Sequence, residues 1–144
     1  MKIYQFTVPG VPVPKGRPRV TRFGTYTPPK TREYENRVRR FWQAEGLPMI
    51  PADTPIRVIV HAWMPLPMSM SLKRRIALDG KIHLGHRADV DNIAKSVCDA
   101  LNGVAYKDDC AIWRIEADKR HHNGEGFTDV VLVVGEDPTA EEDY

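Results

Sequence analysis

Residues 91–135 contain the clearest secondary-structure signals in the chain, and they read DNIAKSVCDALNG (91–103), VAYKDDC (104–110), AIWRIEADK (111–119), RHHNGEGF (120–127) and TDVVLVVG (128–135). In the first segment apolar residues recur at the spacing of one helix face, and Gly103 is typical of the position just past a helix end. Segment 111–119 alternates and segment 128–135 contains the apolar run 130–134, so both predict strands. Asn123-Gly124 between them is a signal for a tight hairpin turn.

The residues before this stretch predict further strands and helices. Segments 3–8 and 56–63 are alternating or β-branched runs that indicate strands. Segment 31–46 has apolar residues at helical spacing, with Thr31 as the N-cap, and segment 71–80 predicts a short helix capped by Ser69 or Ser71. The sum is a single small α+β domain in which a mixed β-sheet of about four strands packs with two to three helices.

Length and composition agree with one globular domain. The chain has 144 residues, of which 42% are hydrophobic and 28% charged, which is enough to build a core. We expect the domain to span residues 1–136, with a basic, proline-rich arm at 9–29, and residues 137–144 to form an acidic, flexible tail. The N-terminus lacks the apolar core of a signal peptide, and no apolar run reaches the ~18 residues of a membrane span. We therefore expect a cytoplasmic protein with no membrane partner. We also expect no small-molecule cofactor.

Positive charge is concentrated at the N-terminal end of the chain. The net charge is only +2, but residues 1–40 hold ten Lys or Arg and two acidic residues, whereas residues 121–144 hold seven acidic residues and no Lys or Arg. Prolines at 9, 12, 14 and 18 exclude a helix, so the arm should be extended. An arm of this kind is suited to phosphate binding, although a merely solvated basic surface is the alternative. The phosphate-binding candidates are Lys15, Arg17, Arg19, Arg22, Arg39 and Arg40.

Acidic residues gather around the helix predicted at 91–103. Asp89 and Asp91 flank Val90, and an extended backbone there would place both carboxylates on one side. Asp91 is also a natural N-cap for the helix. Lys95 and then Asp99 follow at intervals of four residues, so they share a helix face with Asp91. Asp108-Asp109 adds a second acidic pair just before a predicted strand.

Carboxylates grouped in this way suit a magnesium ion. Mg²⁺ prefers oxygen ligands and is often held by one or two carboxylates, water and a substrate phosphate. Such a metal assists phosphodiester hydrolysis, and a neighbouring lysine can stabilise the charge that develops on the phosphate. The spacing also permits a structural interpretation, in which Asp91 is only a cap, Asp108-Asp109 only a turn and Lys95 only an ion-pair partner.

The segment ADVDNIAKSVCDALNGVAYKDDCAI (88–112) resembles the signature of the RusA family of Holliday-junction resolvases, which reads D-x-D-N-x-x-K, D-A-L and then D-D before a strand. The strand at the N-terminus followed by PVPKGRPR (12–19) resembles the opening of phage-type members. The resemblance implies an Mg²⁺-dependent endonuclease that acts as a homodimer on branched DNA, cutting four-way junctions by paired nicks in recombination and repair. It also implies a bacterial or phage-encoded protein.

Carried over to this chain, the family's metal ligands are Asp89, Asp91 and Asp109, and its essential lysine is Lys95. Asn92 matches the family's Asn after the second Asp and is a candidate DNA contact. The chain departs from the family pattern just before Asp89, and Arg87 there is interpreted as a phosphate contact. Asp108 ranks below Asp109, and Asp99 is as well explained by a structural role. Two other functions remain open: a catalytically silent branched-DNA-binding protein, and a nuclease for flaps and forks. Phe23 and Tyr26 in the arm are candidates for stacking on an unpaired base.

Overall fold

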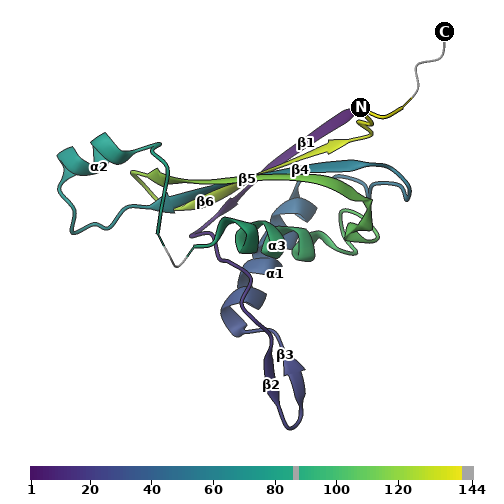
Figure 1. Ribbon diagram of the computed structural model, residues 1–144, viewed down its shortest axis with the longest axis horizontal. Helices are drawn as coiled ribbons and strands as arrows, with labels where there is room; N and C mark the ends of the chain where they lie inside the picture. Colours follow the sequence, from purple (N-terminus) through teal and green to yellow (C-terminus); the bar gives the residue numbers. More distant parts are fainter. Residues whose placement is uncertain (86–87, 141–144) are drawn as a thin grey trace.

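The computed structural model describes residues 1–85 and 88–140. The sheet-forming strands are β1 (Lys2–Pro9), β4 (Ile56–Pro65), β5 (Ile112–His122) and β6 (Phe127–Val134), and the helices are α1 (Pro29–Ala44), α2 (Leu72–Leu78) and α3 (Val90–Leu101). Two short strands, β2 (Arg19–Thr21) and β3 (Gly24–Tyr26), and a 3₁₀ turn, η1 (Asp109–Ala111), complete the elements. Figure 1 shows their arrangement.

The four long strands form one mixed sheet in the order β1-β6-β4-β5. β6 runs antiparallel to both of its neighbours, β1 and β4, whereas β4 and β5 run parallel. The prediction of an α+β domain, in which a mixed sheet of about four strands packs with two to three helices, is therefore confirmed. The parallel pair arises because α2 and α3 lie between β4 and β5 in the sequence and supply the long connection that such a pair needs.

The core lies between one face of the sheet and the helices α1 and α3 (Figure 1). Alternate residues of β4 point to this face and are buried, as the two-residue period of a strand requires. α1 contributes Tyr34, Val38 and Trp42, and Trp42 packs edge-to-face on Phe6 of β1 with ring centroids 5.8 Å apart. α3 buries one face completely, so its other face is free to carry polar groups.

β5 and β6 do not form the hairpin that Asn123-Gly124 predicts, because β4 lies between them in the sheet. The connection from 123 to 126 instead crosses the end of β4. Gly126 makes this crossing possible, since a Cβ there would meet backbone atoms of Val11 at 3.1 Å and Trp63 at 3.2 Å. β4 hydrogen-bonds to β6 on one edge and to β5 on the other. Its alternate apolar residues are buried in the core, as suits a strand in the middle of the sheet.

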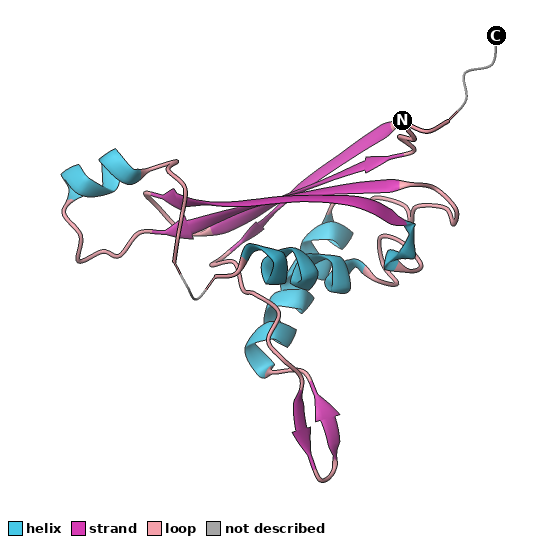
Figure 2. Ribbon diagram, in the orientation of Figure 1, coloured by secondary structure: helices cyan, strands magenta, loops and turns pink. Residues whose placement is uncertain are grey.

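Two local predictions near the arm are also corrected. α1 begins three residues earlier than expected, with Pro28 in place of Thr31 at the N-cap position and no side-chain cap. Thr31 is buried instead, and its hydroxyl accepts a hydrogen bond from the amide of Gly16 at 3.1 Å. The arm is extended as predicted, but its outer part forms the β2–β3 hairpin, which projects away from the sheet (Figure 2).

α2 is a short helix whose start was predicted correctly. Ser71 is its N-cap, and the side chain accepts a hydrogen bond from the amide of Arg74 at 3.3 Å. In the part of the chain that the structure describes, no helix is long and apolar enough to cross a membrane. The acidic tail at 137–144 stays a prediction, and its residues 141–144 lie outside the described residues.

Candidate metal centre and DNA-binding arm

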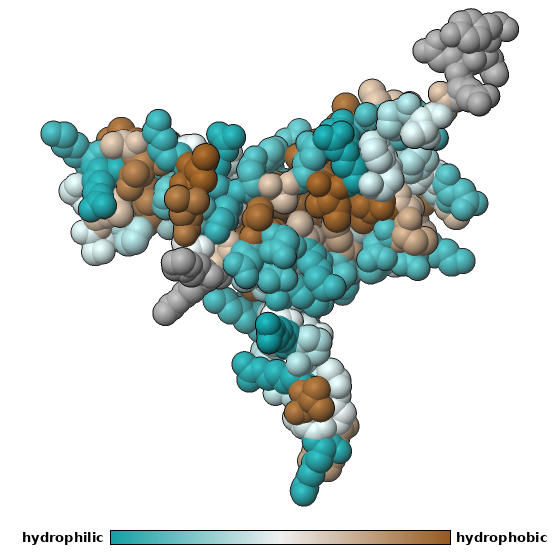
Figure 3. All heavy atoms as spheres, viewed as in Figure 1, coloured by the Kyte–Doolittle hydropathy of each residue, from teal (hydrophilic) through white to brown (hydrophobic). Residues whose placement is uncertain are grey.

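An open cleft of about 420 Å³ lies between α3 and β5. Its polar lining is Asp91, Lys95 and Asp99 from α3 and Asp109 from η1, and its apolar lining is Val90, Ala94, Cys98, Ile115 and Ala117. In Figure 3, hydrophobic surface runs along the edge of the sheet above the hydrophilic surface of α3. The cleft thus places four charged side chains opposite the apolar side chains Ile115 and Ala117 of the edge strand β5.

The α-helical period explains why three of these charges meet. Asp91, Lys95 and Asp99 are spaced by four residues and therefore lie on one face of α3, while Ile93 and Val97 are buried on the other. Asp91 lies in the first turn of the helix, where the positive end of the helix dipole favours a carboxylate. The predicted shared face is confirmed, but Asp91 is not the N-cap.

Asp89 occupies the N-cap position of α3 without accepting a hydrogen bond from the first-turn amides. Its backbone is extended, but the helix starts at Val90, so Asp89 and Asp91 do not alternate along a strand as expected. Asn92 Nδ2 donates a long hydrogen bond of 3.5 Å to Asp89 Oδ2. Asp89 does not line the cleft, and within residues 1–85 and 88–140 no three His, Cys, Asp or Glu side chains are grouped closely enough to hold a metal ion.

Asp109 shows the electrostatics of the cleft most clearly. A hydrogen bond with Asp108, loss of solvent and the negative charges of Asp108 and Asp99 raise the pKa of the Asp109 carboxyl above its usual value, while Lys95 acts in the opposite direction. The hydrogen bond with Asp108 is the largest of these causes, and repulsion between neighbouring carboxylates adds to it. A cation in the cleft would relieve this repulsion.

Tyr106 fixes the loop that carries Asp108 and Asp109. Its ring is buried, and its hydroxyl donates a hydrogen bond of 2.6 Å to the backbone carbonyl of Cys98 in α3. The amide of Gly103 also donates to the Tyr106 carbonyl at 2.8 Å. The acidic loop and the helix are therefore joined by a buried contact, which the sequence did not reveal because a lone tyrosine in a loop carries no pattern.

Replacing Tyr106 with phenylalanine should destabilise the domain by roughly 1–3 kcal/mol, because the buried Cys98 carbonyl loses its side-chain donor. Urea unfolding followed by circular dichroism measures this change. Tyr4→Phe is a matched control, since Tyr4 is only partly buried against Trp42. An unchanged unfolding midpoint for Tyr106→Phe would contradict the assigned contact.

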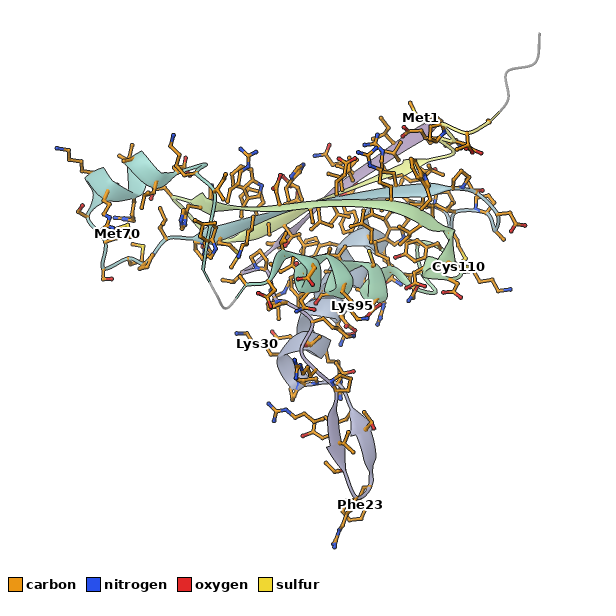
Figure 4. The ribbon with its side chains drawn as sticks, in the orientation of Figure 1. Met1, Phe23, Lys30, Met70, Lys95 and Cys110 are labelled. Carbon is orange, nitrogen blue, oxygen red and sulfur yellow. The ribbon has the colours of Figure 1, made fainter. Side chains whose placement is uncertain are left out.

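The arm presents basic side chains along the projecting hairpin. Arg17, Arg19 and Arg22 are exposed, and the Arg22 guanidinium lies 5.0 Å from the centre of the Phe23 ring. Phe23 stands at the tip, as labelled in Figure 4, with 88% of its surface exposed. Tyr26 pairs with Arg19 across the hairpin. An aromatic ring so exposed is unusual, since burial of its apolar surface is favourable.

Two other predicted phosphate-binding residues are occupied by protein contacts. Lys15 pairs with Glu35 and Asp99, and Arg39 Nε donates to the Ala100 carbonyl at 3.0 Å. Arg40 is exposed on α1. Arg87 lies outside the described residues.

Lys119 on β5 makes contacts near the site that the sequence did not indicate. Its Nζ donates to the backbone carbonyls of Gly85 at 3.0 Å and Ala88 at 2.8 Å. It therefore holds the backbone that immediately precedes Asp89. A lysine in an alternating strand looks like an ordinary solvent-exposed residue, so no sequence signal could have found this role.

Comparison with known protein families gives a match over most of the chain. The model of the family described as endodeoxyribonuclease RusA matches residues 9–130, a range that includes the arm, α3, the acidic loop and the strands β4 and β5. The chain belongs to the RusA endodeoxyribonuclease family. It is also 31% identical over 126 residues to an uncharacterized protein, YqaN, of Bacillus subtilis strain 168, which covers 83% of this chain and 88% of that protein.

Membership of the RusA family implies resolution of Holliday junctions and supports endodeoxyribonuclease activity. RusA-family nucleases generally use a divalent metal, and the cleft between α3 and β5 has donors that fit one. Asp91 and Asp109 offer hard oxygen ligands in the same cleft, and the negative charges of Asp108 and Asp99 contribute to the raised pKa of Asp109. One or two carboxylates are enough when water and phosphate complete the coordination, as is usual for Mg²⁺.

Proposed function

We propose that this chain is an Mg²⁺-dependent endonuclease that resolves four-way DNA junctions by paired, symmetric nicks during recombination and repair. The observation that carries the proposal is the meeting of Asp91, Lys95 and Asp109 in one cleft of a RusA-family chain. A protein that only binds DNA gains nothing from carboxylates grouped near phosphate, because their charges repel it unless a cation intervenes.

Asp91 and Asp109 are the residues of the cleft that would hold the metal. Asp89, at the N-cap of α3 and outside the cleft lining, is proposed as a further ligand that would have to move toward them. When bound there, Mg²⁺ would supply Lewis-acid polarisation of the phosphate and a more acidic water. The Lys95 ammonium is exposed on the same helix face, where it would donate to a phosphate oxygen and stabilise the added negative charge of the transition state. Ile115 and Ala117 of β5 form the apolar side of the cleft, opposite these charged groups.

Arg17, Arg19 and Arg22 are proposed to bind the phosphate backbone, with Arg87 and Asn92 as contacts beside the cut. Arginine suits this task because its planar guanidinium can bind phosphate through two parallel hydrogen bonds. The arm supplies orientation rather than sequence recognition, as phosphate contacts generally do.

A homodimer is proposed because, within residues 1–85 and 88–140, each chain offers one cleft in which Asp91, Lys95 and Asp109 meet. A four-way junction has approximate two-fold symmetry, and two identical subunits related by a two-fold axis would present two equivalent sites. Analytical ultracentrifugation with and without a junction would measure the stoichiometry.

The substrate panel that tests the proposal consists of a four-way junction, a linear duplex, a 5′ flap and a replication fork, each labelled on every strand. With Mg²⁺ present, we expect nicks on two strands of like polarity in the junction, and ends that DNA ligase reseals. Equal cutting of flaps and forks would assign the chemistry to a broader set of substrates. Tight junction binding without nicks would indicate a binding protein instead.

Replacing Phe23 with alanine should weaken junction binding by roughly 1–3 kcal/mol if the ring stacks on an unpaired base at the crossover. Binding to a linear duplex should change little, because all its bases are already stacked. Gel-shift titrations of both DNAs measure the two affinities, and Val20→Ala, another exposed apolar residue of the hairpin, is the control. Equal loss on both DNAs would contradict stacking at the crossover.

A further inference from the structure

Lys15 is enclosed by two acidic side chains from different helices. Its Nζ lies 2.5 Å from Glu35 Oε1 of α1 and 3.2 Å from Asp99 Oδ2 of α3. Only 16% of the Lys15 side chain is exposed, and the Glu35 side chain is similarly covered at 13%. The ammonium therefore faces the protein and not the solvent that a DNA backbone would occupy.

The charge of Lys15 is balanced where it lies. Burial alone would lower the pKa of the ammonium, but hydrogen bonds and charge interactions with Glu35 and Asp99 outweigh this effect and raise its pKa. A lysine neutralised by two carboxylates releases few counterions when DNA approaches, because it has little charge left to offer a phosphate.

The backbone around Lys15 is attached at the same two helices. The Lys15 amide donates to the Asn92 carbonyl at 2.8 Å, in the turn of α3 that also carries Asp91. The next amide, that of Gly16, donates to the hydroxyl of Thr31 in α1. A Cβ on Gly16 would lie 3.0 Å from both Pro28 and Thr31, so the chain fits closely there. The β2–β3 hairpin begins at Arg19, shortly after this double attachment.

We propose that Lys15 is a positioning residue that clamps the base of the arm between α1 and α3 and so sets the direction of the β2–β3 hairpin relative to Asp91 and Lys95. This role replaces the phosphate contact expected from the sequence. The inference rests on the proposed function, because the tests that use DNA assume that the protein binds and cuts junctions. The clamp would keep the DNA-binding hairpin at a fixed distance from the cleft. A fixed distance matters because small errors in the placement of a substrate lower the rate of the chemical step.

The first test compares Lys15→Met with Arg17→Met by the salt dependence of junction binding in EDTA, where no metal-dependent cutting occurs. Removing a phosphate contact reduces the slope of log K against log salt by about 0.9 for each subunit bound. We expect this reduction for Arg17→Met and an unchanged slope for Lys15→Met. A reduction of the same size in Lys15→Met would overturn the proposal.

The second test uses Glu35→Gln, which weakens the clamp without removing a positive charge. Nick positions are mapped at nucleotide resolution in Mg²⁺ under single-turnover conditions. We expect both Lys15→Met and Glu35→Gln to spread the nicks over neighbouring positions and to lower the rate by roughly 10-fold or more. Lys15→Arg should restore much of the wild-type pattern. Wild-type nick positions and rate in Glu35→Gln would contradict the clamp.

The third measurement needs no DNA and separates this inference from the proposed function. Amide hydrogen exchange of Gly16 should accelerate in both Lys15→Met and Glu35→Gln, with the core strand β4 still protected in each. Unchanged protection of Gly16 in both variants would refute the clamp, whatever the substrate. If wild-type protein cuts no junction, the proposed function fails, and the exchange result still decides the role of Lys15.

Discussion

Replacing Asp91 with asparagine is expected to abolish junction cleavage while junction binding is retained or tightened. Asp91 is the exposed first-turn carboxylate of α3 and lines the cleft with Asp109 and Lys95. Asparagine keeps the shape but removes the negative charge that would hold the metal. Losing about 4 kcal/mol of transition-state stabilisation lowers the rate by about 1,000-fold, and we expect a decrease of at least this size. Binding should not suffer, because one repulsive charge near phosphate is removed.

Single-turnover cleavage and gel-shift binding of the same junction check this expectation. Glu45→Gln is the matched control, since Glu45 is an exposed carboxylate at the C-terminal end of α1, the other core helix. Thermal unfolding of both variants should remain close to that of the wild type, as exposed substitutions usually allow. Loss of binding together with cleavage and stability would show that Asp91 is a structural residue.

Replacing Lys95 with methionine should lower the cleavage rate by roughly 100- to 1,000-fold, the usual cost of removing one positioned donor from a charged transition state. Lys95→Arg should recover part of the rate because it keeps the charge with a different geometry. Lys2→Met, which removes an exposed lysine on β1, is the control. The measurement is the single-turnover rate at saturating enzyme, which separates the chemical step from binding.

The pH profile gives a second readout for Lys95. The ammonium lowers the pKa of Asp109, so its removal should raise that pKa further. More of Asp109 is then protonated at a given pH, and a protonated carboxyl is a poor metal ligand. The acid limb of the cleavage profile should therefore move to higher pH in Lys95→Met. If the acid limb stays in place and the rate is close to that of the wild type, Lys95 takes no part in the reaction and is only a surface residue of α3.

α3 and its charged face are the part of the site that the sequence predicts well. A helix face is set by local periodicity, so Asp91, Lys95 and Asp99 could be placed together from spacing alone. That Asp109 joins them depends on tertiary structure, because the buried hydroxyl of Tyr106 holds its loop against α3. The resemblance to the family signature, and not the spacing, indicated that Asp109 belongs with the residues of α3.

The errors arise where a distant part of the chain overrides a local signal. Asn123-Gly124 favours a hairpin, but β4 lies between β5 and β6 and pairs with both of them. The buried face of β4 places that strand in the middle of the sheet. Thr31 fits the N-cap pattern, yet its hydroxyl is used by Gly16 of the arm. Lys15 lies in a basic run typical of phosphate binding, and only the packing of α1 beside α3 brings Glu35 and Asp99 to it.

The central claim is that the cleft between α3 and β5 cuts four-way junctions with the help of a divalent metal. Its most direct test is incubation of purified protein with a labelled junction in Mg²⁺, in EDTA, and in EDTA followed by excess Mg²⁺. We predict paired nicks in the first and third conditions and intact DNA in the second. Nicks that persist in EDTA and are equally strong in Asp91→Asn would contradict the account.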